Sequence, residues 1–116
     1  MIEIMNLRDL KGDQRWYWKK ERWDMKVDRS SPVGNPYEIK DYREVFKKEL
    51  DCRDYVCKLY EREFERLREI PFFEAYLQSL VRIYERHGRL RLWCWCAPKR
   101  CHAETIKHWI VKQTLR

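Results

Sequence analysis

The chain has 116 residues, which is enough for one domain, over residues 1–116, with one modest hydrophobic core. Its residues are 44% hydrophobic and 39% charged, with three glycines and four prolines, and this profile excludes a disordered or low-complexity chain. The net charge of +7 favours anionic partners, which include nucleotides, nucleic acids and membrane surfaces.

The cellular setting follows from what the sequence lacks. Apolar runs stay well short of the roughly 20 residues that span a bilayer, and the first residues do not resemble a signal peptide. We therefore expect no membrane contact and an intracellular, cytoplasmic location, where thiols stay reduced. The odd number of cysteines, five, also fits a disulfide framework poorly. Abundant Glu, Arg and Lys leave one alternative open, a thermophile protein with intracellular disulfides.

Alternating residues predict a first short strand over residues 2–7. The segment that follows interleaves aromatic and basic residues, which favours either a stacking platform for single-stranded nucleic acid or aromatic cover for the core. We favour the second interpretation, because aromatic side chains contribute strongly to burial in a small domain. The aromatic residues are Trp16, Tyr17, Trp18 and Trp23, and the basic ones are Arg15, Lys19, Lys20 and Arg22.

Residues 23–28 alternate again and predict a second strand, which leads into the loop RSSPVGNPY. Two prolines flank Gly34 and Asn35, as in a turn-rich loop of preset shape. Gly34 permits a close backbone approach, Asn35 offers a donor and an acceptor, and Arg29 offers a planar fork for phosphate or carboxylate. On these residues alone, the favoured interpretation is a loop held by proline stiffness.

The middle of the chain is strongly helical. Apolar residues recur at spacings of three and four over residues 41–69, with Glu and Arg on the outer face, and a break near Asp51. Cys52 and Cys57 lie five residues apart, a poor spacing for one helical face, so we interpret them as packing residues. A second helix over residues 71–88 starts with a proline and ends at a glycine.

The last third of the chain predicts a strand, a turn and a helix. Leu and Cys alternate with Arg and Trp over residues 90–94, which predicts a central strand that ends near Cys96 because Pro98 cannot donate to a ladder. Helical spacing resumes near Cys101 or His102. The element order predicts an α/β fold with a small, about three-stranded sheet layered with three or four helices.

The cysteine-rich turn between this strand and helix allows three kinds of chemistry. Three thiolates and an imidazole form a familiar zinc ligand set, but consecutive ligands at a helix start diverge, so no metal is favoured. A nucleophilic cysteine is the second, because a helix N-terminus and nearby cations lower a thiol pKa. The alternative zinc ligands are Cys94, Cys96, Cys101 and His102, and the candidate catalytic residues are Cys101 and His102.

The third kind is phosphate or nucleotide binding without covalent chemistry, and we favour it. Free N–H groups at a helix start attract anions, and Lys99 and Arg100 add positive charge there. Arg29 with Gly34 and Asn35 could close over the same anion. The opposing interpretation is that the cysteines simply pack beside tryptophans as small apolar residues.

The two loops together resemble the family called domain of unknown function 4326, whose members are small proteins of phages and bacteria. The resemblance rests on an Arg-x-x-x-x-Gly-Asn-Pro-aromatic loop and a Cys-x-Cys-x-Pro-x-x-Cys-His turn. It implies a shared site and a plausibly viral origin, but no particular reaction. Many members have Gly and often Asp where this chain has Ala103 and Glu104. The motif residues are Arg29, Gly34, Asn35, Pro36 and Tyr37, then Cys94, Cys96, Pro98, Cys101 and His102.

Our functional hypothesis is a protein that binds a nucleotide or phosphorylated small molecule between the two loops. The alternative is a nucleic-acid-binding module with a structural zinc turn. The sequence does not decide whether the protein is an enzyme. The candidate ligand-binding residues are Arg29, Gly34, Asn35, Tyr37, Cys96, Lys99, Arg100 and Glu104.

Overall fold

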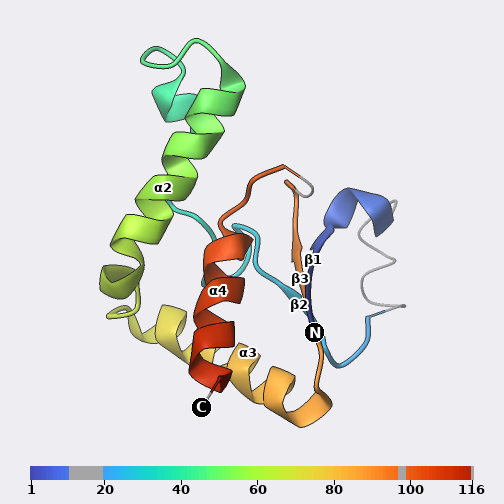
Figure 1. Cartoon of the computed structure of the whole chain (residues 1–116). Coiled ribbons are helices and arrows are strands. Elements are labelled where there is room, and N and C mark those ends of the chain that lie inside the picture. Colours follow the sequence, from blue (N-terminus) through green and yellow to red (C-terminus); the bar gives the residue numbers. More distant parts are fainter. Residues whose placement is uncertain (11–19, 97–98, 116) are drawn as a thin grey trace.

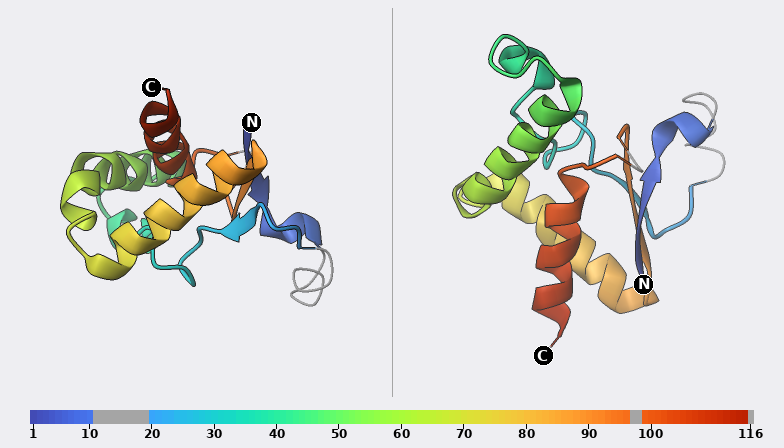
Figure 2. Two further views of the ribbon diagram at one scale, coloured as in Figure 1. Left: turned by 90° about the horizontal axis from the view of Figure 1, so that it is seen from below. Right: turned by 45° about the horizontal axis from the view of Figure 1, so that its top comes forward.

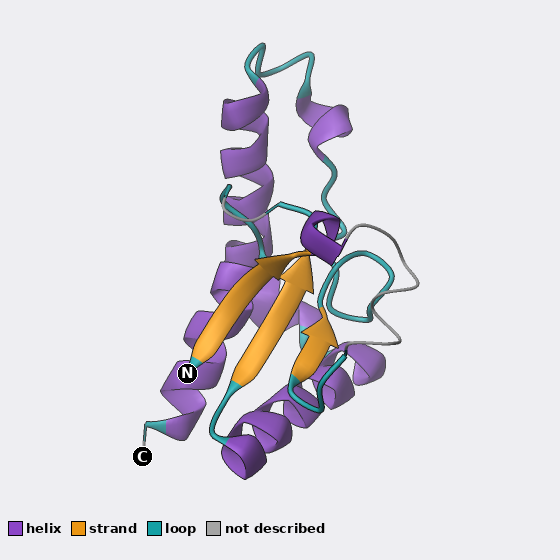
Figure 3. Cartoon of the chain, turned by 90° about the vertical axis from the view of Figure 1, so that its right-hand side faces the viewer, coloured by secondary structure: helices purple, strands orange, loops and turns teal. Residues whose placement is uncertain are grey.

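A small parallel sheet organises the computed structural model, which describes residues 1–10, 20–96 and 99–115. Strands β1 (Ile2–Asn6), β2 (Asp24–Lys26) and β3 (Leu90–Cys94) pair in the order β1-β3-β2 (Figure 3). The central place predicted for β3 is confirmed, since Leu90 and Leu92 are fully buried. With all three strands parallel, their carboxyl ends share one edge of the sheet.

The described residues form three α-helices, which lie on one side of the sheet (Figure 1), and two short 3₁₀ helices, so the predicted α/β fold is confirmed. The α-helices are α2 (Glu49–Leu67), α3 (Pro71–His87) and α4 (Ala103–Thr114), and the 3₁₀ helices are η1 (Leu7–Leu10) and η2 (Ile39–Tyr42). Helix α3 crosses α4 at a steep angle, and α2 extends past the carboxyl ends of the strands (Figure 1, Figure 2). Helix α4 begins on the side of the molecule where the carboxyl ends of the strands lie (Figure 1).

Apolar periodicity explains why α3 forms and where it stops. Its buried side chains recur at spacings of three and four and face the main core. The helix starts at Pro71, whose missing N–H costs nothing in a first turn. It ends at Gly88, which has a left-handed φ of 71° and donates its N–H to the carbonyl of Tyr84. The buried residues of α3 are Phe73, Leu77, Leu80 and Val81.

The predicted helix over residues 41–69 is wrong in its first two turns, because the residues before α2 form η2 and a bend. Tyr42 and Phe46 recur at helical spacing for a different reason. Both rings pack on Tyr55 of α2, with centroids 4.9 and 5.1 Å away. Val45, which completes the apolar pattern in the sequence, is 71% exposed. The periodicity therefore reflects a segment folded back on α2, not a continuous helix.

The aromatic segment is described only in part, since Trp16, Tyr17 and Trp18 lie outside the described residues. Trp23 is partly buried, and the Arg89 guanidinium lies 4.5 Å from the centroid of its ring. The ring of Trp23 also lies 5.8 Å from the ring of His87, centroid to centroid. No helix in the described ranges combines the length and the apolar character that crossing a membrane requires.

Candidate functional site

A cavity of about 220 Å³ opens where the strands end, and we call it the edge cavity. Residues that follow each of the three strands line this cavity. They are Arg8 after β1, Asp28 and Arg29 after β2, and Trp95 and Cys96 after β3. The carboxyl edge of an open parallel sheet is the usual place for a ligand site, because loops from several strands meet there. The edge cavity therefore lies where open α/β folds usually bind their ligands.

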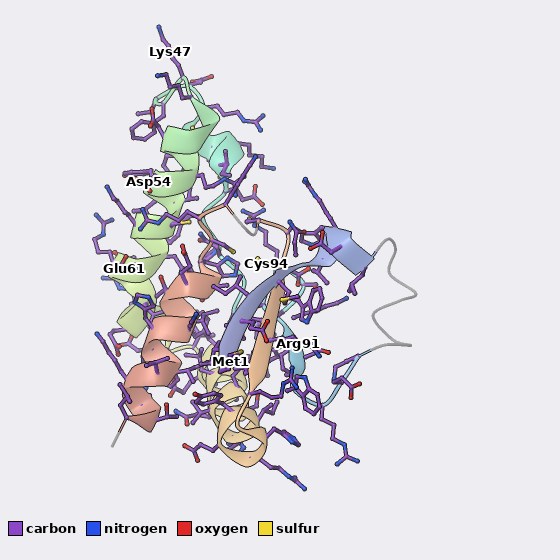
Figure 4. All side chains as sticks on the ribbon, turned by 45° about the vertical axis from the view of Figure 1, so that its right-hand side comes forward. Met1, Lys47, Asp54, Glu61, Arg91 and Cys94 are labelled. Atoms are coloured by element: carbon purple, nitrogen blue, oxygen red, sulfur yellow. The ribbon has the colours of Figure 1, made fainter. Side chains whose placement is uncertain are left out.

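Two helices close the edge cavity. Helix α2 contributes Arg53 and Cys57, and the start of α4 contributes Cys101 and His102. Figure 4 shows Cys94 at the end of β3 on the side where α2 runs past it, with Lys47 far away at the tip of the molecule. The lining thus combines segments from both ends of the sequence.

The sequence analysis names eleven candidate catalytic, ligand-binding or metal-binding residues. Seven of them line the edge cavity, and four do not. Gly34 lines a separate hollow beside the loop, and the Tyr37 carbonyl accepts a hydrogen bond from Arg29. Lys99 is exposed, and Glu104 lines a separate groove between α2 and α4. None of these four lines the edge cavity. The residues that do line it are Arg29, Asn35, Cys94, Cys96, Arg100, Cys101 and His102.

The loop of residues 29–37 is held by its own side chains. Asn35 is 6% exposed, its Nδ2 donates to the Val56 carbonyl (3.2 Å), and its Oδ1 accepts from the Tyr37 N–H (2.9 Å). Arg29 donates from Nε to the Asn35 carbonyl and from Nη2 to the Tyr37 carbonyl. A Cβ at Gly34 would lie 2.6 Å from the Arg29 Cα, so only glycine fits. Asn35 and Gly34 therefore shape the loop that presents Arg29.

Two more buried hydrogen bonds tie the segment after β2 to the helices. The Tyr60 hydroxyl donates to the Val33 carbonyl (2.8 Å), and His102 Nε2 contacts the Val27 carbonyl. That contact fixes the proton on Nε2 and leaves Nδ1 as an acceptor, 3.4 Å from the Cys101 sulfur. Burial lowers the pKa of His102, so its imidazole is neutral at pH 7. His102 thus joins β2, the turn and α4.

The pKa values of Cys96 and Cys101 are shifted in opposite directions. A hydrogen bond from the Cys101 thiol lowers the pKa of Cys96 to about 6, and hydrogen bonding and charge from Arg53, with the charge of Arg29, act in the same direction. Hydrogen bonds to Cys94 and Cys96, followed by burial, raise the pKa of Cys101. Cys96 is therefore a thiolate at neutral pH, whereas Cys101, the nucleophile that the sequence suggests, is a protonated donor.

Protein carboxylates already occupy the positions expected to hold an anion at the start of α4. The Glu104 carboxylate accepts the N–H of Cys101 (3.4 Å), just before α4 begins. Arg100 pairs with Asp54 and approaches Glu61 (3.7 Å), both on α2. The positive charge that faces the edge cavity therefore comes mainly from arginines outside the helix start.

The residues named as alternative zinc ligands do not form a metal site in the structure. Within the ranges described, no group of three or more His, Cys, Asp or Glu side chains is arranged to hold a metal ion. His102 shows one reason, since Nε2 contacts the Val27 carbonyl and Nδ1 faces Cys101.

The sequence reasoning missed several residues of the edge cavity, above all Arg53, Arg8 and Asp28. Arg53 had a signal, because it stands in the stripe of α2 that also carries Cys57 and Tyr60, both buried. A charged side chain on the buried face of a helix indicates that a polar group of another segment faces it. Arg8 had no comparable signal in the sequence.

Comparison with protein-family models shows that the chain belongs to the family described as Domain of unknown function (DUF4326), with a match over residues 10–112. Both loops of the edge cavity, residues 29–37 and the cysteine turn, lie inside the matched range. Comparisons with curated proteins and with solved structures gave no match.

Proposed function

We propose that the edge cavity binds a nucleotide or another phosphorylated small molecule and that Arg29 and Arg53 hold its phosphate. One observation carries the proposal: four arginines line a single small cavity at the carboxyl edge of a parallel sheet. Among its described lining residues, Asp28 is the acidic one. The intracellular and viral setting expected from the sequence remains part of this proposal.

Guanidinium chemistry suits this role. Arginine presents a planar fork that pairs with two oxygens of a phosphate, and each charge-assisted bond is stronger than a neutral one. Arg29 is anchored through Nε and Nη2, yet its side chain is 57% exposed at the cavity rim. Arg53 lines the same cavity from α2. Arg100 contributes less, because Asp54 and Glu61 already offset its charge.

The size of the edge cavity limits what it encloses. A volume of about 220 Å³ is below the 300–1,000 Å³ typical of pockets that surround a drug-sized ligand. A phosphate and the group next to it fit inside, and the rest of the ligand extends outward. Trp95 is 45% exposed at the rim, and its indole N–H is fixed by Asp28 (3.0 Å). This ring offers a flat surface on which a base can stack.

The test is isothermal titration calorimetry with ADP and with inorganic pyrophosphate. Arg29→Gln and Arg53→Gln should each weaken binding of both probes roughly 10- to 100-fold, because a lost charge-assisted bond is worth about 1.5–3 kcal/mol. Arg62→Gln is the matched control, since Arg62 is also on α2, is 69% exposed and pairs only with Glu63 among the contacts described.

Two results would overturn the proposal. One is that neither probe binds the wild-type protein. The other is that Arg62→Gln weakens binding as much as Arg53→Gln, which would show a diffuse charge effect. Tight binding of a single-stranded oligonucleotide, with stoichiometric zinc and no binding of ADP, would instead support the nucleic-acid-binding module.

A further inference from the structure

Cysteine thiols are concentrated in the edge cavity. Four of the five cysteines of the chain line it, and the fifth, Cys52, packs elsewhere with its thiol directed at the Phe46 carbonyl. Only one of the five, Cys96, is partly exposed, and the other four are buried. A small oxidant that enters the cavity therefore meets Cys96 first. The cysteines of the lining are Cys57, Cys94, Cys96 and Cys101.

The surroundings of Cys96 contain a second thiol, a cation and a base. The Cys101 thiol and the Arg53 guanidinium both lower the pKa of the Cys96 thiol, and all three residues line the edge cavity. On its other side, the Cys101 sulfur lies 3.4 Å from Nδ1 of His102. Cys96 and Cys101 are thus a partly exposed thiol and a buried thiol of the same cavity, with a neutral imidazole beside the second.

We propose that Cys96 is a peroxide-reactive thiol and that Cys101 resolves it, so that the two residues close a reversible disulfide. This inference does not depend on anion binding, because it concerns the thiols of the edge cavity and not the ligand that its arginines hold.

In the first step, the Cys96 sulfur attacks one oxygen of hydrogen peroxide. An S–O bond forms and the O–O bond breaks, so the sulfur is oxidised by two electrons and the peroxide is reduced. The leaving hydroxide takes up a proton and becomes water, while Cys96 becomes a sulfenic acid. Arg53 supports this step, since a cation at the sulfur favours the thiolate that attacks.

In the second step, the Cys101 sulfur attacks the Cys96 sulfur. Its proton passes to Nδ1 of His102, which is an acceptor because Nε2 is held at the Val27 carbonyl. The S–S bond forms as the S–O bond breaks, and the leaving hydroxide takes up that proton as water. Two thiols and one peroxide thus give one disulfide and two waters, and a dithiol reductant restores the starting state.

The experiment treats the reduced full-length protein with one equivalent of hydrogen peroxide, blocks the remaining thiols and maps linked peptides by mass spectrometry. Lys99 and Arg100 lie between the two cysteines, so trypsin separates them and a disulfide joins two distinct peptides. We expect the Cys96–Cys101 link in the wild type. Cys96 should also be oxidised at least roughly tenfold faster than Cys52.

Two variants identify the attacked sulfur. In Cys101→Ser, the reaction should stop at a sulfenic acid on Cys96, which dimedone traps. In Cys96→Ser, neither the trapped acid nor the link should form, whereas Cys52→Ala, outside the edge cavity, should behave like the wild type. A Cys94–Cys101 link in the wild type, or oxidation of Cys52 as fast as Cys96, would overturn the proposal even if a variant failed to fold.

Discussion

Replacing Asn35 with alanine separates a loop-shaping role from a ligand-binding role. The side chain is buried and makes two hydrogen bonds, one to the Val56 carbonyl and one from the Tyr37 N–H. Each bond contributes about 1 kcal/mol net, and an unpaired, partly buried Tyr37 N–H adds to the loss. We therefore expect Asn35→Ala to lower the free energy of unfolding by about 2–3 kcal/mol.

The measurement is the thermal midpoint by circular dichroism, with Glu38→Gln as a control in the same loop. For a domain of this size, each kcal/mol shifts the midpoint by roughly 3–5 °C, so Asn35→Ala should lose roughly 6–15 °C. The control removes only exposed ion pairs, with Lys40 at 3.1 Å and Arg29 at 3.9 Å, and should shift it by less than about 2 °C.

A second substitution, Asn35→Asp, gives the same role a pH signature. The new carboxyl keeps the acceptor for Tyr37 but turns an oxygen toward the Val56 carbonyl, which raises its folded-state pKa above the usual value of about 3.9. The folded state then holds the proton more tightly than the unfolded state. The free energy of unfolding therefore falls as pH rises from about 3.9 through the raised pKa of the folded state. A thermal midpoint unchanged in both variants would refute the structural role of Asn35.

Three further predictions concern the loop and the thiols. Gly34→Ala should cost about 1–3 kcal/mol in urea unfolding, because the added methyl meets backbone atoms of Arg29 at 2.6 Å. Tyr60→Phe should cost about 1–2 kcal/mol in the same assay, since it leaves the buried Val33 carbonyl without its donor. The alkylation rate of Cys96 by iodoacetamide should rise with pH through about 6, where its thiolate forms.

Each of these predictions has a plain counter-result. Full stability of Gly34→Ala would mean that the loop does not approach Arg29 so closely. Wild-type stability of Tyr60→Phe would remove the hydroxyl from the contacts that hold Val33. An alkylation rate for Cys96 that rises only near pH 9 would mean that neighbouring groups leave its pKa unshifted.

The sheet was predictable because its signals are local. Alternation of Leu and Cys with Arg and Trp marks β3, and the two faces of that strand are buried against different clusters, Leu92 in the main core and Trp93 beside Leu7. The end of α3 was equally readable, because Gly88 is a residue that accepts a left-handed φ. These features depend on neighbours within one turn or one strand.

The rest depends on contacts between distant segments. The stripe position of Arg53 indicates a polar partner but not that this partner is the cysteine cluster, and nothing at the helix start shows that Glu104 accepts the Cys101 N–H. The sequence named Asn35 as a ligand-binding residue, and in the structure its amide bonds to the Val56 carbonyl and the Tyr37 N–H. The short motifs pointed to the two segments that line the edge cavity. What each side chain contacts there depends on residues that are distant in the sequence.

The most direct test of the proposed site is a phosphate titration followed by NMR of the arginine Nε–Hε groups. Signals are assigned with Arg29→Gln, Arg53→Gln and the control Arg62→Gln. If the edge cavity holds phosphate, the Arg29 and Arg53 signals shift together with one saturable dissociation constant while Arg62 stays unchanged. Uniform, unsaturable shifts of all three, or shifts confined to Arg62, would contradict an anion site in the edge cavity.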